Sequence, residues 1–211
     1  MDEKTLAKEV YKRLSGIYKN PKIDLEFESP FELLIETVLA AQERDEKVNT
    51  IRKDFFKRFK DPKALKEAPL EDIKEAIKSI SFYNKKAIAI KEIATILVDK
   101  FDGKVPDTEE KLTSLPGVGK KTANMVLANA FGKPAIAVDR HVHRIVHRLG
   151  LDTNKDPDKT TEHLKSLIEK EHWTEFYLLL LRHAKEVCTA KNPKCHECVL
   201  KDICKSYGSV K

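Results

Sequence analysis

The chain has 211 residues, with 40 Lys or Arg against 34 Asp or Glu, which gives a formal net charge of +6. This length fits one large or two small domains, and few glycines among abundant Ala, Leu, Ile, Glu and Lys favour an all-helical protein. The basic excess fits a polyanionic partner, whereas the longest strongly apolar run, residues 176–181, is too short to span a bilayer.

The first part of the chain shows the spacing of amphipathic helices. An amphipathic helix from residue 4 to about residue 18 is predicted by an apolar stripe at steps of four, four and three, made of Leu6, Val10, Leu14 and Ile17. Ser29 as N-cap, Pro30 at the first helical position and Glu32 three residues after the cap predict a second helix, which we expect to be mostly buried.

Three further apolar stripes predict helices over residues 48–59, 70–80 and 85–101. A capping-box pattern, with Asp107 as N-cap and Glu110 three residues later, predicts another short helix. Together with the helix described next, the pattern predicts about six helices between residues 29 and 132.

The next segment, LPGVG, predicts a tight hairpin between two helices. Gly117 and Gly119 allow a sharp turn that leaves several N–H groups unpaired at the start of a helix over residues 120–131. These amides and the positive end of the helix dipole suit a phosphate, and Lys120 and Lys121 add charge there. Taken alone, such a turn is equally well a helix connection without a ligand.

The segment IAVD ends at Asp139 and leads into a helical run that stops at Gly150. Asp139 is placed to cap this helix, which by itself explains its residue type. His143 and His147 are four residues apart, but the run lacks the glutamate of a zinc-protease motif, so we interpret them as surface or DNA-facing residues. Two more helices are expected around residues 158–170 and 173–187.

The four cysteines lie within seventeen residues near the end of the chain, at Cys188, Cys195, Cys198 and Cys204. The amino terminus has no apolar leader, so we expect a cytoplasmic protein, where disulfides are rare. The cysteines therefore indicate a tetrathiolate metal site. Spacing alone does not separate zinc from an iron–sulfur cluster, although zinc sites usually show two close pairs.

The pattern LPGVGKKTAN followed by IAVDRHVHR closely resembles the helix-hairpin-helix and catalytic aspartate of the endonuclease III family of DNA glycosylases, and the resemblance extends along nearly the whole chain. It implies an all-α, two-lobed fold. Residues 23–133 would form a six-helix domain carrying the hairpin, and residues 1–22 with 134–211 would form an iron–sulfur cluster domain.

The resemblance also assigns roles to two residues. Lys121 is implied as the nucleophile and Asp139 as its catalytic partner. The helix dipole and the neighbouring Lys120 both favour a neutral amine at Lys121, as a nucleophile requires. The competing interpretation of Lys121 is a solvated lysine that binds phosphate.

Two loop residues are implied to fill the space left when a base is extruded from the duplex. These are Gln42 and Phe82, which would otherwise be a polar residue at a helix end and a core aromatic. Ser81 departs from the glycine expected before Phe82. Asp45 matches a position lining the family's pocket, or only caps the next helix, and His141 is expected to support the active site and contact DNA.

The resemblance implies a 4Fe-4S cluster with the four cysteines as ligands and a structural role. Lys191 and Lys194 lie in the same segment, which we expect to present a basic loop to DNA phosphates. Solvated surface charge is the competing interpretation of these lysines.

These implications define the expected function: a bifunctional DNA glycosylase and abasic-site lyase that removes damaged pyrimidines through a lysine Schiff base. We expect a monomer, associated with the nucleoid, that binds double-stranded DNA carrying a damaged base or an abasic site, with no membrane partner. The alternatives are a monofunctional mismatch glycosylase acting on adenine or thymine, and a non-catalytic DNA-binding module.

Overall fold

The computed structural model describes residues 1–209, and these residues form helices and loops without a strand. The prediction of an all-α protein is confirmed. No helix within these residues combines the length and the apolar character needed to cross a membrane. The chain divides into two compact units, one made of Met1–Lys22 with the chain from Lys133 onward and one made of Ile23–Gly132.

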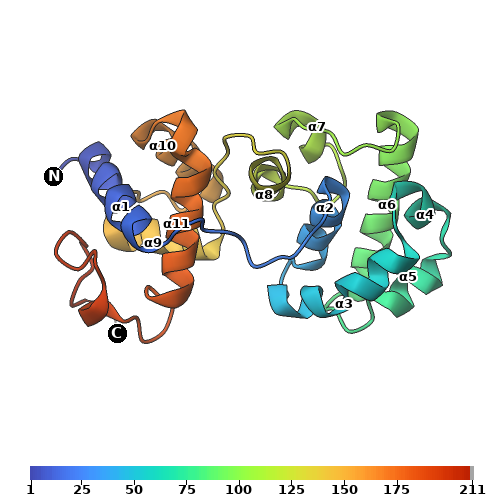
Figure 1. Ribbon diagram of the computed structural model, residues 1–211, viewed down its shortest axis with the longest axis horizontal. Coiled ribbons are helices and arrows are strands. Elements are labelled where there is room, and N and C mark those ends of the chain that lie inside the picture. The colour runs from blue at the N-terminus through green and yellow to red at the C-terminus, as the bar shows by residue number, and fades with distance from the viewer. Residues whose placement is uncertain (210–211) are drawn as a thin grey trace. The chain divides into compact units, whose positions relative to one another are not determined.

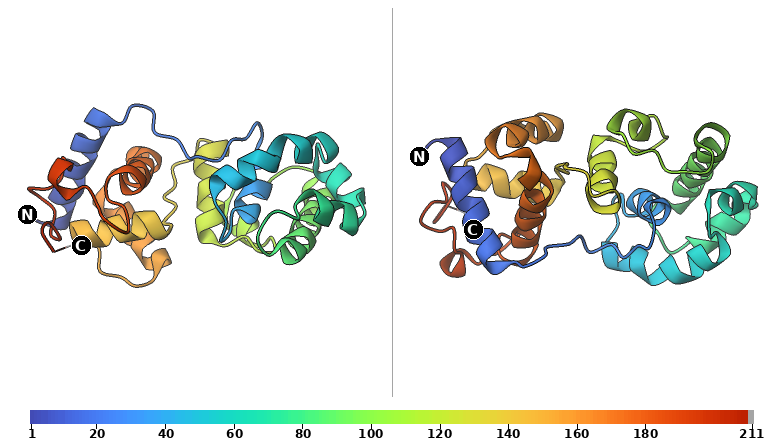
Figure 2. Two further views of the ribbon diagram at one scale, coloured as in Figure 1. Left: turned by 90° about the horizontal axis from the view of Figure 1, so that it is seen from below. Right: turned by 45° about the horizontal axis from the view of Figure 1, so that its top comes forward.

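The first unit joins the start of the chain to its last third. Its helices are α1 (Glu3–Ile17), α9 (Arg140–Leu149), α10 (Pro157–Leu167) and α11 (Trp173–Glu186), with short 3-10 helices at Lys170–His172 and Cys195–Glu197. Helix α1 packs against α10 and α11, and α11 also packs against α9, a grouping that both views of Figure 2 show. Every residue of α11 from Phe176 to Leu181 is buried, so this helix forms the centre of the unit.

The second unit contains seven helices within residues 23–132 (Figure 1). They are α2 (Pro30–Leu39), α3 (Asp45–Arg58), α4 (Pro62–Glu67), α5 (Leu70–Ala76), α6 (Tyr83–Phe101), α7 (Glu109–Thr113) and α8 (Lys120–Ala130). The additional helix is α4, which the sequence pattern did not predict. Its start carries a clear signal, because Asp61 accepts a hydrogen bond from the Ala64 amide at 2.8 Å and Pro62 occupies the first turn.

Three local predictions are wrong in their details. Helix α7 is capped by Thr108, whose hydroxyl accepts from the Lys111 amide, and not by Asp107. Asp45 is the first residue of α3 and not its cap. Ile17, predicted on the buried stripe of α1, is 49% exposed because the helix ends there.

The second helix lies at the centre of the second unit, where it packs against α8, α6 and α3. Its predicted cap is confirmed, since Ser29 accepts from the Glu32 amide at 3.2 Å. The burial of α2 includes one carboxyl group: Glu36 is 0% exposed, and its Oε1 lies 3.3 Å from Nε of Arg52 without hydrogen-bond geometry. Burial raises the pKa of Glu36 to about 8.

Candidate active site and metal centre

The hairpin between α7 and α8 is held from its buried side. Leu115 and Val118 are 2% and 5% exposed, and the Val118 amide donates to the Leu115 carbonyl at 3.2 Å. Gly117 has a φ of +73°, a left-handed conformation that favours glycine. No atom lies within 4 Å of where a Cβ would stand on Gly117 or Gly119, so the outer side of the turn is open to an approaching backbone.

Both lysines after the turn are exposed on the first turn of α8. The helix behind them is anchored, because Ala123 through Ala128 are buried and α8 packs against α2 and α7. The first amides of a helix have no intrahelical acceptor, so this turn combines N–H groups at a helix start, a helix dipole and two cationic side chains. That arrangement suits a phosphate close to Lys121.

Asp139 begins α9 in the other unit. The preceding residues 135–138 are all buried, and the Ala135 amide donates to the Thr174 hydroxyl at 3.2 Å, which fixes the approach to the helix. Oδ1 of Asp139 accepts from the amides of His141 and Val142 at 2.9 and 2.8 Å, so the predicted N-cap role is confirmed. Within the described part of the chain, both of these bonds end on Oδ1. The other carboxylate oxygen of Asp139 is therefore available to bind a ligand.

His141 is half-buried beside this aspartate. Burial lowers the pKa of its imidazole, which favours the neutral ring near neutral pH. Arg144, one helical turn further on, donates to the carbonyl oxygens of Ala184 and Cys188 at 2.8 and 2.9 Å. Arg144 therefore fastens α9 to the end of α11, from which the cysteine segment departs.

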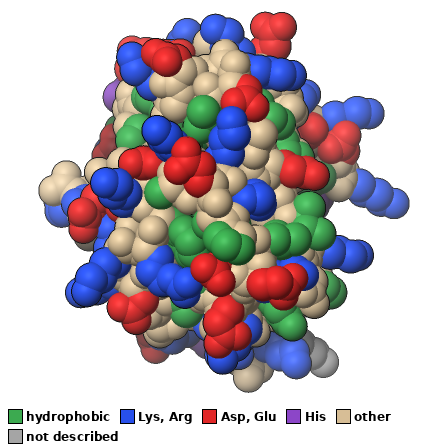
Figure 3. All heavy atoms as spheres, turned by 90° about the vertical axis from the view of Figure 1, so that its right-hand side faces the viewer, with side chains coloured by type: hydrophobic (Ala, Val, Ile, Leu, Met, Phe, Trp, Pro, Cys, Tyr) green, Lys and Arg blue, Asp and Glu red, His purple; other side chains and the backbone are tan. Residues whose placement is uncertain are grey.

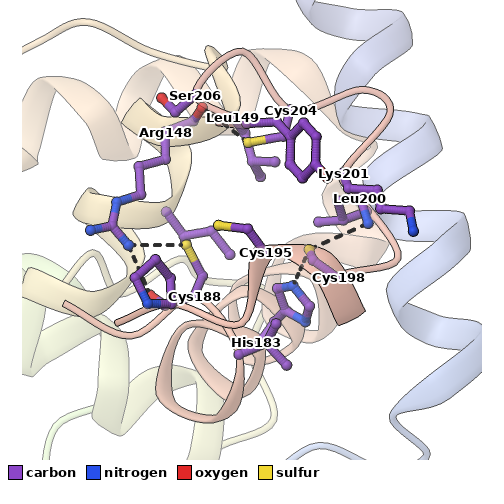
Figure 4. A pocket seen from close by; sticks show the side chains of 14 residues that line it. Arg148, Leu149, His183, Cys188, Cys195, Cys198, Leu200, Lys201, Cys204 and Ser206 are labelled. Carbon is purple, nitrogen blue, oxygen red and sulfur yellow. Dashed lines mark hydrogen bonds between the residues drawn. The ribbon is translucent and has the colours of Figure 1, made fainter. Parts of the chain in front are cut away.

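The four cysteine side chains line one pocket, as Figure 4 shows. Nη1 of Arg148 lies 3.4 Å from Sγ of Cys188, and the Leu200 amide donates to Sγ of Cys198 at 3.4 Å. His183 is 2% exposed; its Nε2 lies 3.3 Å from Sγ of Cys198, and its Nδ1 lies 3.1 Å from the Tyr18 hydroxyl. The spacing of apolar residues does not indicate these contacts to sulfur, although Arg148 and His183 lie on helices that it predicts.

These sulfur atoms fit an iron–sulfur cluster. All four thiols face one pocket, and four cysteine thiolates are the usual ligands of a 4Fe-4S cluster. Burial raises the pKa of Cys198 and Cys204, so their thiolates require a bound cation, and amide and guanidinium donors to sulfur are typical of iron–sulfur sites.

Gln42 and Phe82 are exposed at the tips of two loops of the second unit. Phe82 is 60% exposed, so it is not a core aromatic. Both residues have left-handed backbones, with φ of 55° for Gln42 and 59° for Phe82, which is uncommon for residues other than glycine. The two loops are hydrogen-bonded to each other through Ser81. The sequence pattern identifies Ser81 only as a departure from the glycine expected before Phe82.

The histidine pair of α9 has a structural explanation. Nε2 of His143 and Nε2 of His147 lie 2.9 and 2.8 Å from the same carbonyl oxygen, that of Asn154. Both rings are half-buried, and their position on a surface that faces DNA stays a prediction. They hold the chain after α9 in place.

The predicted basic loop is exposed at both Lys191 and Lys194. By contrast, the face over α4, α5 and α6 in Figure 3 intersperses basic and acidic side chains. Ion pairs of this unit include Lys66 with Asp99 at 2.5 Å and Lys74 with Glu71 at 2.6 Å. That face therefore carries no gathered positive charge.

Comparison with known proteins gives the family. Residues 35–170 match the HhH-GPD superfamily of base excision DNA repair proteins, and residues 188–204 match the iron–sulfur binding domain of endonuclease III. Endonuclease III of Thermotoga maritima is 42% identical over 202 residues, which cover 96% of this chain and 92% of that protein. This chain belongs to the endonuclease III family.

Solved structures agree with this membership. A trapped endonuclease III–DNA covalent intermediate superimposes with a TM-score of 0.95 at 35% identity, covering 99% of both chains. A thermostable thymine-DNA glycosylase superimposes with a TM-score of 0.86 at 25% identity, covering 98% of this chain and 97% of that one. The fold is thus similar to that of a thymine-DNA glycosylase as well, and the sequence is more similar to endonuclease III.

Membership in the endonuclease III family establishes the reaction class. The protein is a DNA-binding, base-excision DNA glycosylase with abasic-site lyase activity, and its cofactor is a 4Fe-4S cluster. The expected fold with a helix-hairpin-helix and an iron–sulfur region is confirmed.

Proposed function

We propose that this endonuclease III homologue excises oxidised pyrimidines, with the Lys121 amine as nucleophile. The observation that carries the proposal is the position of Lys121, exposed on the first turn of α8 directly after the open glycine turn. Its amine would attack C1′ of the extruded nucleotide and break the glycosidic bond, and opening of the sugar ring would give a Schiff base. Loss of a proton from C2′ would then break the C3′–O bond by β-elimination.

Asp139 would support this chemistry from the start of α9. Its Oδ1 is fixed by two backbone amides, so the free carboxylate oxygen has a defined direction. A carboxylate near C1′ stabilises positive charge that develops on the sugar, and it accepts a proton as the amine becomes a nucleophile. His141, whose amide bonds Asp139, would position this group and contact the DNA backbone.

Binding would rest on the backbone of duplex DNA with a damaged base or an abasic site. The amides of Gly117 and Gly119 would hold a phosphate together with Lys120, and Lys191 and Lys194 would contact other phosphates. Gln42 and Phe82 would fill the gap left by the extruded nucleotide. The protein would act as a monomer, in the cytoplasm on nucleoid DNA.

The metal centre would have a structural role. Cys188, Cys195, Cys198 and Cys204 would hold the 4Fe-4S cluster, which shapes the loop carrying Lys191 and Lys194. The two units, residues 1–22 with 134–211 and residues 23–133, would act as the cluster domain and the hairpin domain.

Borohydride trapping tests the proposal. The natural protein, Lys121→Gln and Asp139→Asn are mixed with duplex DNA carrying thymine glycol, and a covalent adduct is sought by gel electrophoresis. We expect an adduct with the natural protein, none with Lys121→Gln, and a reduced yield with Asp139→Asn, since asparagine preserves the helix cap but not the charge.

Two results would contradict the assignment. Base release without an adduct would indicate a monofunctional reaction. That alternative is considered because the protein is structurally similar to a thymine-DNA glycosylase. An adduct that persists in Lys121→Gln would show that another amine is the nucleophile. Lys120→Gln is the matched control, because it removes a neighbouring exposed cation, and we expect it to weaken DNA binding while still forming the adduct.

A further inference from the structure

One carboxylate joins the two loops that carry Gln42 and Phe82. Glu43, between α2 and α3, accepts hydrogen bonds on Oε2 from both the amide and the hydroxyl of Ser81, each at 2.9 Å. Ser81 lies between α5 and α6, 38 residues away in the sequence. The side chain of Glu43 is 9% exposed and Ser81 is exposed, so the link lies at the surface of the unit.

A buried lysine links the same two regions a second time. Lys86, in the first turn of α6, is 7% exposed and donates from Nζ to the carbonyl oxygen of Leu39 at 2.6 Å. Leu39 is the last residue of α2, where carbonyl groups lack intrahelical partners. Burial lowers the pKa of Lys86, and the Glu43 carboxylate opposes that effect, so the two links support each other.

Hydrogen bonds from Ser81 and Arg44 hold the pKa of Glu43 near 2, so this group is a carboxylate at neutral pH. Lys47 adds a further contact, with Nζ 3.2 Å from Oε2. A serine at position 81 supplies the hydroxyl donor that a glycine lacks. The hydroxyl group that Ser81 carries in place of the expected glycine therefore donates a hydrogen bond to Glu43.

The linked residues are direct neighbours of the two exposed loop tips. Gln42 precedes Glu43 and Phe82 follows Ser81, and both tips have left-handed backbones. Such a conformation is unfavourable for a residue with a Cβ, so surrounding contacts must maintain it. The Glu43–Ser81 link provides those contacts on both loops at once.

We propose that Glu43 is a positioning residue that holds Gln42 and Phe82 in the spacing needed to enter the duplex together. The inference rests on the proposed function of these two residues as the groups that replace an extruded nucleotide. Holding both loops in place before binding removes the entropic cost of ordering them on DNA. Glu43 acts through its neighbours and takes no part in bond breaking.

The test separates base extrusion from the covalent chemistry. Extrusion is followed by stopped-flow fluorescence of 2-aminopurine placed beside thymine glycol in a duplex, in the Lys121→Gln background so that no bond breaks. Chemistry is followed in otherwise natural protein by single-turnover cleavage of that duplex and of a single strand with a plain abasic site, which needs no extrusion. The variants are Glu43→Ala, Glu43→Gln, Ser81→Ala and both alanines together, with Glu71→Ala as control, because Glu71 pairs with Lys74 on the surface of the same unit.

We expect Glu43→Ala to slow extrusion and duplex cleavage about tenfold while changing single-strand cleavage by less than about twofold. Ser81→Ala keeps the amide bond and should have a smaller effect, and the double variant should be no slower than Glu43→Ala because one interaction is lost in both. Glu43→Gln retains an oxygen acceptor and should recover part of the rate. Glu71→Ala should behave as the natural protein.

Equal losses on both substrates, or an unchanged extrusion rate in Glu43→Ala, would overturn the proposal. Should Glu43→Ala prove poorly folded by circular dichroism, Ser81→Ala and Glu43→Gln decide by the same comparison. Failure of the natural protein to form a borohydride-trapped adduct on either substrate would refute the lysine mechanism instead. The fluorescence measurement needs no covalent step and would still decide the role of Glu43.

Discussion

Glu36 shows how a single buried carboxyl group sets a pH dependence. Its oxygens have no hydrogen-bond partner among the described residues, and Arg52 is already engaged by Glu32 at 2.7 Å. Burial raises the pKa of Glu36 from its ordinary value of 4.5 to about 8. Between these values the folded chain binds a proton that the unfolded chain releases, so stability falls as the pH rises.

Glu36→Gln should therefore stabilise the protein increasingly from about pH 5 to about pH 8, by roughly 1–3 kcal/mol at the alkaline end, because glutamine needs no proton. Urea unfolding at several pH values measures this difference. The control is Glu71→Gln, whose side chain is 79% exposed and which should leave the shape of the profile unchanged. A constant offset between Glu36→Gln and the natural protein across this range would contradict the prediction.

At the scale of one element, the hairpin depends on the left-handed backbone of Gly117. An alanine at this position would have open space around its Cβ. Its backbone would still have to adopt a φ of +73°, which costs about 1–2 kcal/mol. Relief of that strain would turn the neighbouring amides away from their phosphate-binding directions. Gly117→Ala should weaken binding to damaged and undamaged duplex alike, several-fold, as titration by fluorescence anisotropy would show, since phosphate contacts carry no sequence information.

Gly16 provides the matched substitution. It lies in α1, also with open space around a Cβ, but its backbone is not left-handed. Gly16→Ala should raise stability by about 0.5–1 kcal/mol and leave DNA affinity unchanged. Equal losses of affinity in both variants would show that the conformation of Gly117 is not what matters.

Local signals predicted elements better than they predicted contacts. Some helix ends depend only on residues within four positions of each other, so the sequence shows them directly. Examples are the N-cap at Ser29, the N-cap at Asp139 and the helix stop at Gly150. The Glu43–Ser81 link joins residues 38 positions apart, and the contact of His183 with Cys198 joins two separate segments. Such pairs depend on how helices pack, which the spacing of apolar residues does not specify.

At the scale of the whole molecule, the cysteine segment fastens several parts of one unit together. Arg13 of α1 donates to the Val199 carbonyl at 2.9 Å, and the Ser206 amide donates to the Arg148 carbonyl at 3.0 Å. The cluster that this segment holds therefore supports the packing of α1 and α9 as well as its own loop.

Replacing Cys204 with alanine should release this segment and destabilise only one of the two units. Hydrogen–deuterium exchange should show lost amide protection in α1, α9 and residues 188–209, while residues 23–132 keep theirs. Val199→Ala, at an exposed side chain in the same loop, is the control and should change neither pattern. Loss of protection throughout residues 23–132 would show that the two units unfold as one.

The discontinuous composition of that unit has a consequence during synthesis. Residues 23–132 are contiguous and can fold as soon as they leave the ribosome, whereas α1 must wait for α10 and α11, the second of which ends at Glu186. At about 5–20 residues per second this delay lasts roughly 10–30 s. Throughout it the apolar stripe of Leu6, Val10 and Leu14 stays uncovered on the nascent chain, so we expect chaperones to bind α1 during this interval.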